Sequence, residues 1–230
     1  MSFQSFHETW FEQLRQVVHE LGQAPRPATS AEHHHLQQQL VQKVMSHCHD
    51  YYRLKSIAAK RDILGVFTAP WATSLERSLH WIGGWRPTTV FHLIYTESSI
   101  LFESHIMDIL RGLRNGDLGD LTPSQLRRVS ELQCQTVQEE NYIADQLSDW
   151  QDGGSDIIGM MSGNLEAKME KLAEILEKAD ELRMKTITNL VELLTAQQAV
   201  EFLIAAAQLM FGIRRWGINH DRRRENNVSQ

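Results

Sequence analysis

Apolar side chains recur every three to four residues along most of this chain, and such spacing predicts amphipathic α-helices. The clearest stripe lies between about residues 164 and 194, where charged residues fill the other faces. Val, Ile and Thr are not gathered in alternating runs, so the sequence predicts no strand. We therefore expect an all-α fold, a single bundle of long helices with an N-terminal helix joined by a Pro-containing linker. The stripe consists of Leu165, Met169, Leu172, Leu176, Ala179, Leu182 and Thr186.

Turn-forming residues divide the helices from one another. Pro25 and Pro27 mark a linker, two glycines mark a turn at 115–120, and four glycines in 151–163 predict a flexible loop. The second helix is so long that it either packs as in a coiled coil or contains a break. The expected helices cover about residues 5–21, 31–67, 73–82, 87–113 (interrupted or not at Ser98–Ser99), 123–150, 164–194 and 195–217. The expected organisation is an N-terminal helix (1–22), a linker (23–30), a helical domain (31–218) and a polar basic tail (219–230).

Capping motifs mark several of these helix starts. A capping box pairs a Ser or Thr with a Glu or Gln three residues later, and each side chain satisfies a backbone amide of the other. In one case a proline occupies the first helical position, where its missing N–H costs nothing. The boxes are Ser5 with Glu8, Thr73 with Glu76, Thr122 with Gln125 after Pro123, and Thr195 with Gln198.

The segment 71–87 holds three of the six tryptophans and a Gly-Gly pair. Gly83 and Gly84 can adopt the left-handed backbone that ends a helix, which predicts a tight corner before the next helix. Two interpretations stay open for this corner. It is either packed, with Arg86 stacked on an indole, or it forms a pocket for a carboxylate with an apolar tail. The residues concerned are Trp71, Trp81, Trp85 and Arg86.

The charge of the chain is uneven. The net charge is −6, while residues 214–224 alone carry a local excess of +4 and leave −10 for the remainder. A general nucleic-acid binder would normally be basic, so that class is not expected. The basic segment allows three interpretations: it complements the negative end of the last helix, serves as a nuclear-import patch, or contacts phosphate. Two cysteines, no apparent signal peptide and no apolar run long enough to span a bilayer fit a reducing compartment without membrane insertion.

Catalytic and metal-binding patterns are not evident. His33, His34 and His35 are consecutive and point about 100° apart on a helix, so they do not share one ion easily. Cys48 lies on an apolar stripe and is expected to be a buried thiol. Glu139 and Glu140 are expected at the surface. Without a phosphate-binding glycine loop or a nucleophile elbow, we expect a non-enzymatic protein with no metal site.

Three blocks of sequence carry a family resemblance. The run Pro70-Trp71-x-x-Ser74-Leu75-Glu76-Arg77-x-Leu79-x-Trp81-Ile82-Gly83-Gly84-x-Arg86-Pro87 resembles the signature of the plant Delay of Germination family, whose domain also forms the C-terminal half of TGA-type bZIP transcription factors. Further matches occur in the family order. They are Leu121-Thr122-Pro123-Ser124-Gln125-Leu126, then Ala179-Asp180-Glu181-Leu182-Arg183 with Thr186, and Leu194-Thr195-Ala196-Gln197-Gln198-Ala199.

The resemblance implies two candidate sites. A segment of the founding protein that is regarded as the contact for a protein phosphatase is similar to the stretch holding Glu8, Trp10, Phe11 and Glu12. Because Trp10 and Phe11 are adjacent, we expect one of them to be exposed as an interface anchor. The founding protein is also regarded as a haem binder, but Met210 and Arg214 occupy the aligned histidine positions. Methionine ligates haem iron and arginine does not, so haem is not expected as a cofactor.

The resemblance further implies a regulator of seed dormancy, seed development and abscisic-acid response, located in nucleus and cytoplasm and acting through protein contacts and transcription regulation. A protein phosphatase is the expected partner. No basic region followed by leucine heptads opens the chain, so direct DNA binding is not expected. Two alternatives stay open: a small-ligand sensor for haem or an apolar carboxylate, and a transcription cofactor that forms a homodimer through the 165–194 face and has sequence-specific DNA-binding proteins as partners.

Overall fold

The computed structural model describes residues 3–153 and 162–228, and helices make up most of them. The described residues contain no strand, which confirms the all-α fold. The helices are α1 (Phe3–Gly22), α2 (Ala31–Ala59), α3 (Ile63–Thr68), α4 (Ser74–Ser78), α5 (Thr89–Ser104), α6 (Ile106–Leu110), a 3₁₀ turn η1 (Leu118–Asp120), α7 (Pro123–Asp152), α8 (Ser162–Leu193) and α9 (Ala196–Val228).

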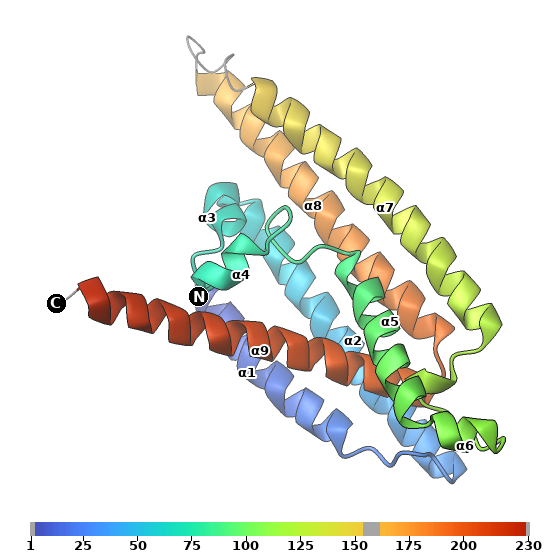
Figure 1. Ribbon diagram of the computed structural model, residues 1–230. Coiled ribbons are helices and arrows are strands. Elements are labelled where there is room, and N and C mark those ends of the chain that lie inside the picture. Colours follow the sequence, from blue (N-terminus) through green and yellow to red (C-terminus); the bar gives the residue numbers. More distant parts are fainter. Residues whose placement is uncertain (1–2, 154–161, 229–230) are drawn as a thin grey trace.

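Two groups of long helices meet at α2. On one side, α7 and α8 lie antiparallel along their length (Figure 1). On the other side, α1 and α9 pack against α2 and against each other. The short helices α3 and α4 and the connection to α5 lie between these groups (Figure 1). The segment 71–87 is therefore placed where both groups can contact it.

Three clusters of buried side chains form the core. The largest joins α2, α5, α8 and α9, and a second joins α3 with α7 and α8. The third fixes α1 on α9 and contains Trp10, Phe11 and Leu14. The apolar stripe of α8 is used inside the molecule, because Leu172, Leu176 and Leu182 are all buried. A homodimer through that stripe would require the α7–α8 pair to open.

Local capping signals place most helix starts correctly. The capping boxes at Thr73 and at Thr122 are confirmed. Thr195 and Gln198 exchange the two expected hydrogen bonds at the start of α9. The Ser5 box is wrong, because α1 begins at Phe3 and Ser5 lies inside the helix.

Several helix limits differ from the expectation because tertiary contacts set them. The expected long second helix breaks after Ala59, and Asp62 caps the separate helix α3. The expected helix 73–82 lasts only five residues, and Leu79 on its expected apolar stripe is 54% exposed. The next helix continues through Ser98–Ser99 and instead ends before His105. Much of the expected loop 151–163 lies outside the described residues.

The last helix is longer than its sequence pattern predicts. It was expected to end near Trp216–Gly217 with a frayed tail, but α9 continues to Val228. The extension is held by α4, since Asp221 accepts hydrogen bonds from the backbone N–H and the hydroxyl of Ser74. By length and composition alone α9 could cross a membrane, a test that the core helix of a soluble protein also passes. Here α9 packs on α1, α2, α4 and α5.

Candidate functional site

A tight turn at residues 81–84 forms the centre of the 71–87 segment. The backbone of Trp81 and Gly84 exchanges two hydrogen bonds, with N–O distances of 2.7 and 3.3 Å. Between them, Ile82 and Gly83 have φ angles of +44° and +65°. Gly83 therefore adopts the expected left-handed conformation, whereas a β-branched residue such as Ile82 rarely does. The surroundings must stabilise this backbone.

Three charged side chains supply that stabilisation, and we call Lys55, Asp180 and Arg183 the buried charge cluster. Arg183 is fully buried and donates to the carbonyl oxygens of Trp81, Ile82 (2.9 Å) and Trp85 (2.7 Å). Lys55 Nζ donates to the Gly83 carbonyl at 2.9 Å. Asp180 Oδ1 accepts from both cations, at 2.9 Å from Lys55 and 2.5 Å from Arg183. The turn and the neighbouring Trp85 carbonyl are thus held from α2 and α8 by four hydrogen bonds, and the two donors share one carboxylate.

The buried charge cluster holds two cations and one anion. Burial lowers the pKa of Lys55 to about 8, and Asp180 opposes that shift. The turn's carbonyl oxygens, aimed at the cations, replace the missing second carboxylate. Every group in the cluster has a partner, so its first role is to fix the turn. Asp180 and Arg183 belong to a block that carries the family resemblance. Their role in fixing the turn gives a physical reason for these two residues in that block.

Arg86 does not stack on an indole, which corrects the expectation for the corner. Its Nε donates to Glu140 Oε2 at 2.7 Å. Glu140 was expected at the surface but is 1% exposed, because it also accepts from the backbone N–H and hydroxyl of Thr88. The guanidinium that lies over an indole is that of Arg183, 5.5 Å from the Trp81 ring centre.

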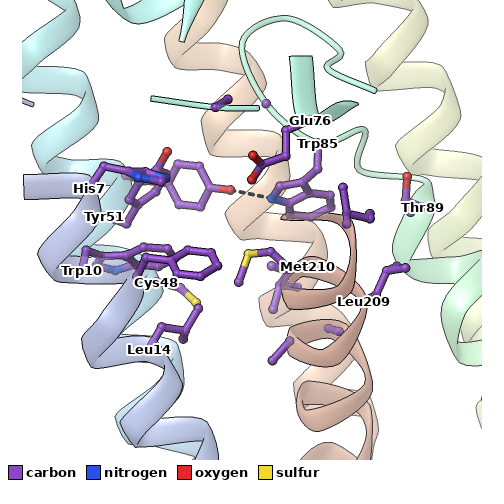
Figure 2. Close-up of a pocket in the computed structure, with 18 of the residues that line it drawn as sticks. His7, Trp10, Leu14, Cys48, Tyr51, Glu76, Trp85, Thr89, Leu209 and Met210 are labelled. Atoms are coloured by element: carbon purple, nitrogen blue, oxygen red, sulfur yellow. Dashed lines mark hydrogen bonds between the residues drawn. The ribbon is translucent and has the colours of Figure 1, made fainter. Parts of the chain in front are cut away.

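Gly83 and Gly84 of the turn also line a cavity of about 300 Å³, which we call the aromatic cavity. It lies between α1, α2, α9 and the 71–93 segment (Figure 2). Trp71 and Trp85 line it, as expected for a pocket at the corner, whereas Trp81 and Arg86 do not. Other lining residues include His7, Trp10, Cys48, Tyr51, Tyr52, Lys55, Glu76, His80, Thr89, Ala206 and Met210.

The polar groups of the aromatic cavity are incompletely paired. His7 is 7% exposed, and its Nδ1 has no hydrogen-bond partner among the described residues. Burial, with a smaller contribution from Arg214, lowers the pKa of His7 to about 4, so the ring is neutral at pH 7. Tyr52 accepts a hydrogen bond from Trp85 Nε1 at 2.8 Å (Figure 2). Burial also raises the pKa of Tyr51 and raises that of Cys48 to about 12, so both stay protonated.

Arg214 contacts Glu76 and Phe11, two residues that line the aromatic cavity. Its Nη1 lies 3.3 Å from both carboxylate oxygens of Glu76, and its guanidinium lies 4.7 Å from the Phe11 ring centre. A cation engaged in this way supplies no axial ligand to haem iron. Met210 lines the cavity, but the two residues at the positions implied by the resemblance do not together fit haem.

Trp10 and Phe11 are both buried, at 7% and 6% exposure, so the expectation that one is exposed is wrong. Helix α1 lies in the groove between α2 and α9, and each ring meets a different neighbour. Trp10 donates from Nε1 to the His47 carbonyl on α2, while Phe11 contacts Phe211 on α9. Glu8 and Glu12 are exposed on the outer side of α1. The carboxylates, not the aromatic rings, are thus available to a partner.

Sequence reasoning missed Lys55, Glu140 and His7. Lys55 lies four residues after Tyr51 on the apolar stripe of the second helix, and a charged residue at such a position signals a buried partner. Glu140 and His7 carry no comparable signal. Within residues 3–153 and 162–228, no group of three His, Cys, Asp or Glu side chains could hold a metal ion.

Comparison with known proteins places the chain among plant regulators. A family described as seed dormancy control matches residues 13–96, which include the turn and Lys55. The protein DOG1-like 4 of Arabidopsis thaliana is 30% identical over 231 residues, which cover 94% of this chain and 91% of that protein. DOG1-like 1 of the same plant is 30% identical over 210 residues, covering 76% and 75%. The transcription factor TGA1 is 26% identical over 185 residues, and the match spans 79% of this chain but only 48% of TGA1.

Proposed function

The chain belongs to the DOG1 family of seed dormancy control proteins, and we propose that it is a non-enzymatic regulator that acts by binding other proteins. Its similarity to dormancy proteins and to TGA transcription factors supports a regulatory role in plants. Asp180 and Arg183, two charged residues of the resembling blocks, are engaged in contacts that fix the turn. Recognition is therefore left to the surface.

We place the protein contact on the outer side of α1. The observation that carries this choice is the burial of Trp10 and Phe11, which anchors the helix and leaves Glu8 and Glu12 exposed four residues apart. We propose a protein phosphatase of the abscisic-acid pathway as the partner, in nucleus and cytoplasm. Because surface carboxylates steer association, charge changes there should alter the affinity without harming the fold.

The test is a titration of the purified protein with such a phosphatase by calorimetry. Glu8→Lys with Glu12→Lys should weaken binding at least tenfold. The matched control is Glu166→Lys with Glu170→Lys, two exposed carboxylates with the same spacing on α8. Equal affinities of the three proteins, or no binding by any, would exclude this site. Alanine at Trp10 and Phe11 is unsuitable, because it would remove core side chains.

A second candidate function is the sensing of a small apolar carboxylate by the aromatic cavity. Lys55 lines the cavity, and two of its three N–H groups are used by Gly83 and Asp180. Since the buried charge cluster carries one more cation than anion, one anion beside Lys55 would balance it. His7 Nδ1 offers a further polar contact, and the aromatic lining suits an apolar body.

Decanoate and decanol provide a matched pair of probes for this cavity. Decanoate should raise the melting temperature and quench tryptophan fluorescence, whereas decanol of the same chain length should do so less, because it lacks the charge. Haemin, followed by its absorbance spectrum, tests the other ligand class. If the protein responds to none of decanoate, decanol and haemin, the sensor hypothesis is excluded. An equal response to acid and alcohol would leave an apolar site without a carboxylate subsite.

A further inference from the structure

The C-terminal half of α9 presents one continuous exposed face, which we call the outer face of α9. Its members are three adjacent pairs seven residues apart (208/209, 215/216 and 222/223) and two single residues between them (212 and 219), so they lie on one side of the helix. Leu209 and Trp216 are large apolar members, 42% and 58% exposed. The opposite side of the helix carries the contacts with α4. The outer face consists of Gln208, Leu209, Gly212, Arg215, Trp216, Asn219, Arg222 and Arg223.

The helix that carries this face is fixed to the body of the protein. Gly217 packs so closely on Thr73 that a Cβ atom there would clash with the threonine hydroxyl. Asp221 accepts from Ser74 one turn later, and Arg214 pairs with Glu76 one turn earlier. Because three successive turns are held, the outer face is a rigid surface rather than the frayed tail expected from its polar sequence.

Gly212 is the residue of this face that the fold itself does not explain. Glycine destabilises a helix interior relative to alanine, so it needs a reason there. Gly217 has one, the contact with Thr73, but a Cβ at Gly212 would meet nothing within 4 Å. Leu209 and Trp216 flank the position at three and four residues. The missing side chain leaves a notch between two exposed apolar groups, where another chain can approach closely.

The charge of the outer face indicates the chemistry of the partner chain that would approach the notch. Arg215, Arg222 and Arg223 are exposed and have no ion-pair partner among the described residues. They belong to a protein whose net charge is −6. Trp and Arg are the residues most enriched among the energetically dominant positions of protein interfaces. An apolar notch followed by arginines fits a helix that offers an apolar side chain and then carboxylates.

We propose that the outer face of α9 is a docking site for an acidic amphipathic helix of another protein. An apolar side chain of that helix occupies the notch at Gly212, and its carboxylates pair with Arg215, Arg222 and Arg223. Nucleic acid fits less well, since the rest of the molecule is acidic and a phosphate backbone offers no apolar group to occupy the notch. This site is separate from the carboxylates of α1, so its test does not depend on the outcome for the proposed phosphatase contact.

A phage-displayed library of helical peptides, selected on the full-length protein, tests the proposal. We expect the recovered peptides to combine Asp and Glu with Leu, Ile or Phe spaced three or four apart. Gly212→Leu fills the notch and should weaken a recovered peptide at least tenfold in fluorescence anisotropy, with no fall in melting temperature. Arg215→Glu with Arg222→Glu should weaken it similarly. The matched control is Arg114→Glu with Arg127→Glu, two exposed arginines elsewhere.

Four results would overturn the proposal. The recovered peptides could lack acidic residues, or they could bind the Gly212→Leu protein as tightly as the unmodified one. A DNA duplex could bind the outer face as tightly as the best peptide, which would indicate a general polyanion contact. Light scattering could show a dimer that Gly212→Leu abolishes, which would assign the face to a second copy of this chain.

Discussion

The turn at residues 81–84 separates two regions with opposite properties. Toward α8 it meets the buried charge cluster, in which each of the three charged side chains is hydrogen-bonded. Toward α1 it meets the aromatic cavity, where His7 Nδ1 has no hydrogen-bond partner among the described residues and open volume remains. A buried polar group without a partner lowers the free energy of unfolding, so the unpaired His7 makes the cavity side less stable than a fully paired arrangement would be. Incomplete pairing is typical of a functional site, and complete pairing is typical of a structural one.

Because the two regions differ in this way, changes in them should act with opposite sign. Removing one partner from the fully paired cluster leaves the others buried and unpaired, and this is strongly destabilising. Replacing an unpaired group of the cavity, or filling its volume, should cost little or should stabilise. The four predictions that follow are ordered from the largest effect on the free energy of unfolding to the smallest.

Arg183→Met should give the largest loss, about 3–5 kcal/mol, because it leaves the carbonyl oxygens of Ile82 and Trp85 without a donor and removes one of the two cations paired with Asp180. Lys55→Met should cost less, since Asp180 would still be paired with Arg183 and only the Gly83 carbonyl would lose its partner. Urea denaturation measures both. Arg127→Met, an exposed arginine of α7, is the control and should change the free energy by less than about 0.5 kcal/mol. Equal effects of Arg183→Met and Arg127→Met would contradict the role of the cluster.

Acid should weaken the cavity side through His7. The pKa of His7 is about 4 in the folded protein and about 6.5 in the unfolded chain, so the unfolded chain takes up the proton first as the pH falls. Stability should therefore fall between pH 6.5 and pH 4, by about 3 kcal/mol from this one group. The difference between the unmodified protein and His7→Gln, measured by urea denaturation at several pH values, isolates the effect. Parallel pH profiles would show that His7 is not the group concerned.

How far the sequence predicts these regions depends on the distance over which each contact acts. Caps such as Thr122 with Gln125 involve neighbours in the chain and are predicted correctly. Lys55 and Asp180 are 125 residues apart, and Arg86 and Glu140 are 54 apart. No local pattern pairs such residues, so the sequence assigns the arginine that stacks on an indole to Arg86, whereas it is Arg183. Trp10 and Phe11 fail for a related reason: a helix in a groove between two others buries a wider face than a helix on a flat surface.

Gly84→Ala should have an intermediate effect on the paired side. The added Cβ would lie 2.9 Å from Arg183 Cζ, so the guanidinium that holds the turn would have to move. We expect a loss of about 2 kcal/mol in thermal or urea unfolding. Gly212→Ala is the matched control, because the Cβ there meets open space and the helix gains about 1 kcal/mol instead. A loss of similar size in both variants would mean that crowding at Arg183 is not the cause.

Ala206→Leu should have the smallest effect and the opposite sign. Ala206 lines the aromatic cavity, and the larger side chain fills part of its volume. Filling a cavity without strain commonly adds about 1 kcal/mol, so the melting temperature should rise slightly. The same change should abolish the response to decanoate, because probe and leucine compete for one space. Replacing an exposed residue of the same helix, Gln208→Leu, should leave the decanoate response unchanged. If Ala206→Leu instead destabilised the protein by several kcal/mol, the space beside it would already be filled by side chains, and the contrast between the two sides of the turn would disappear.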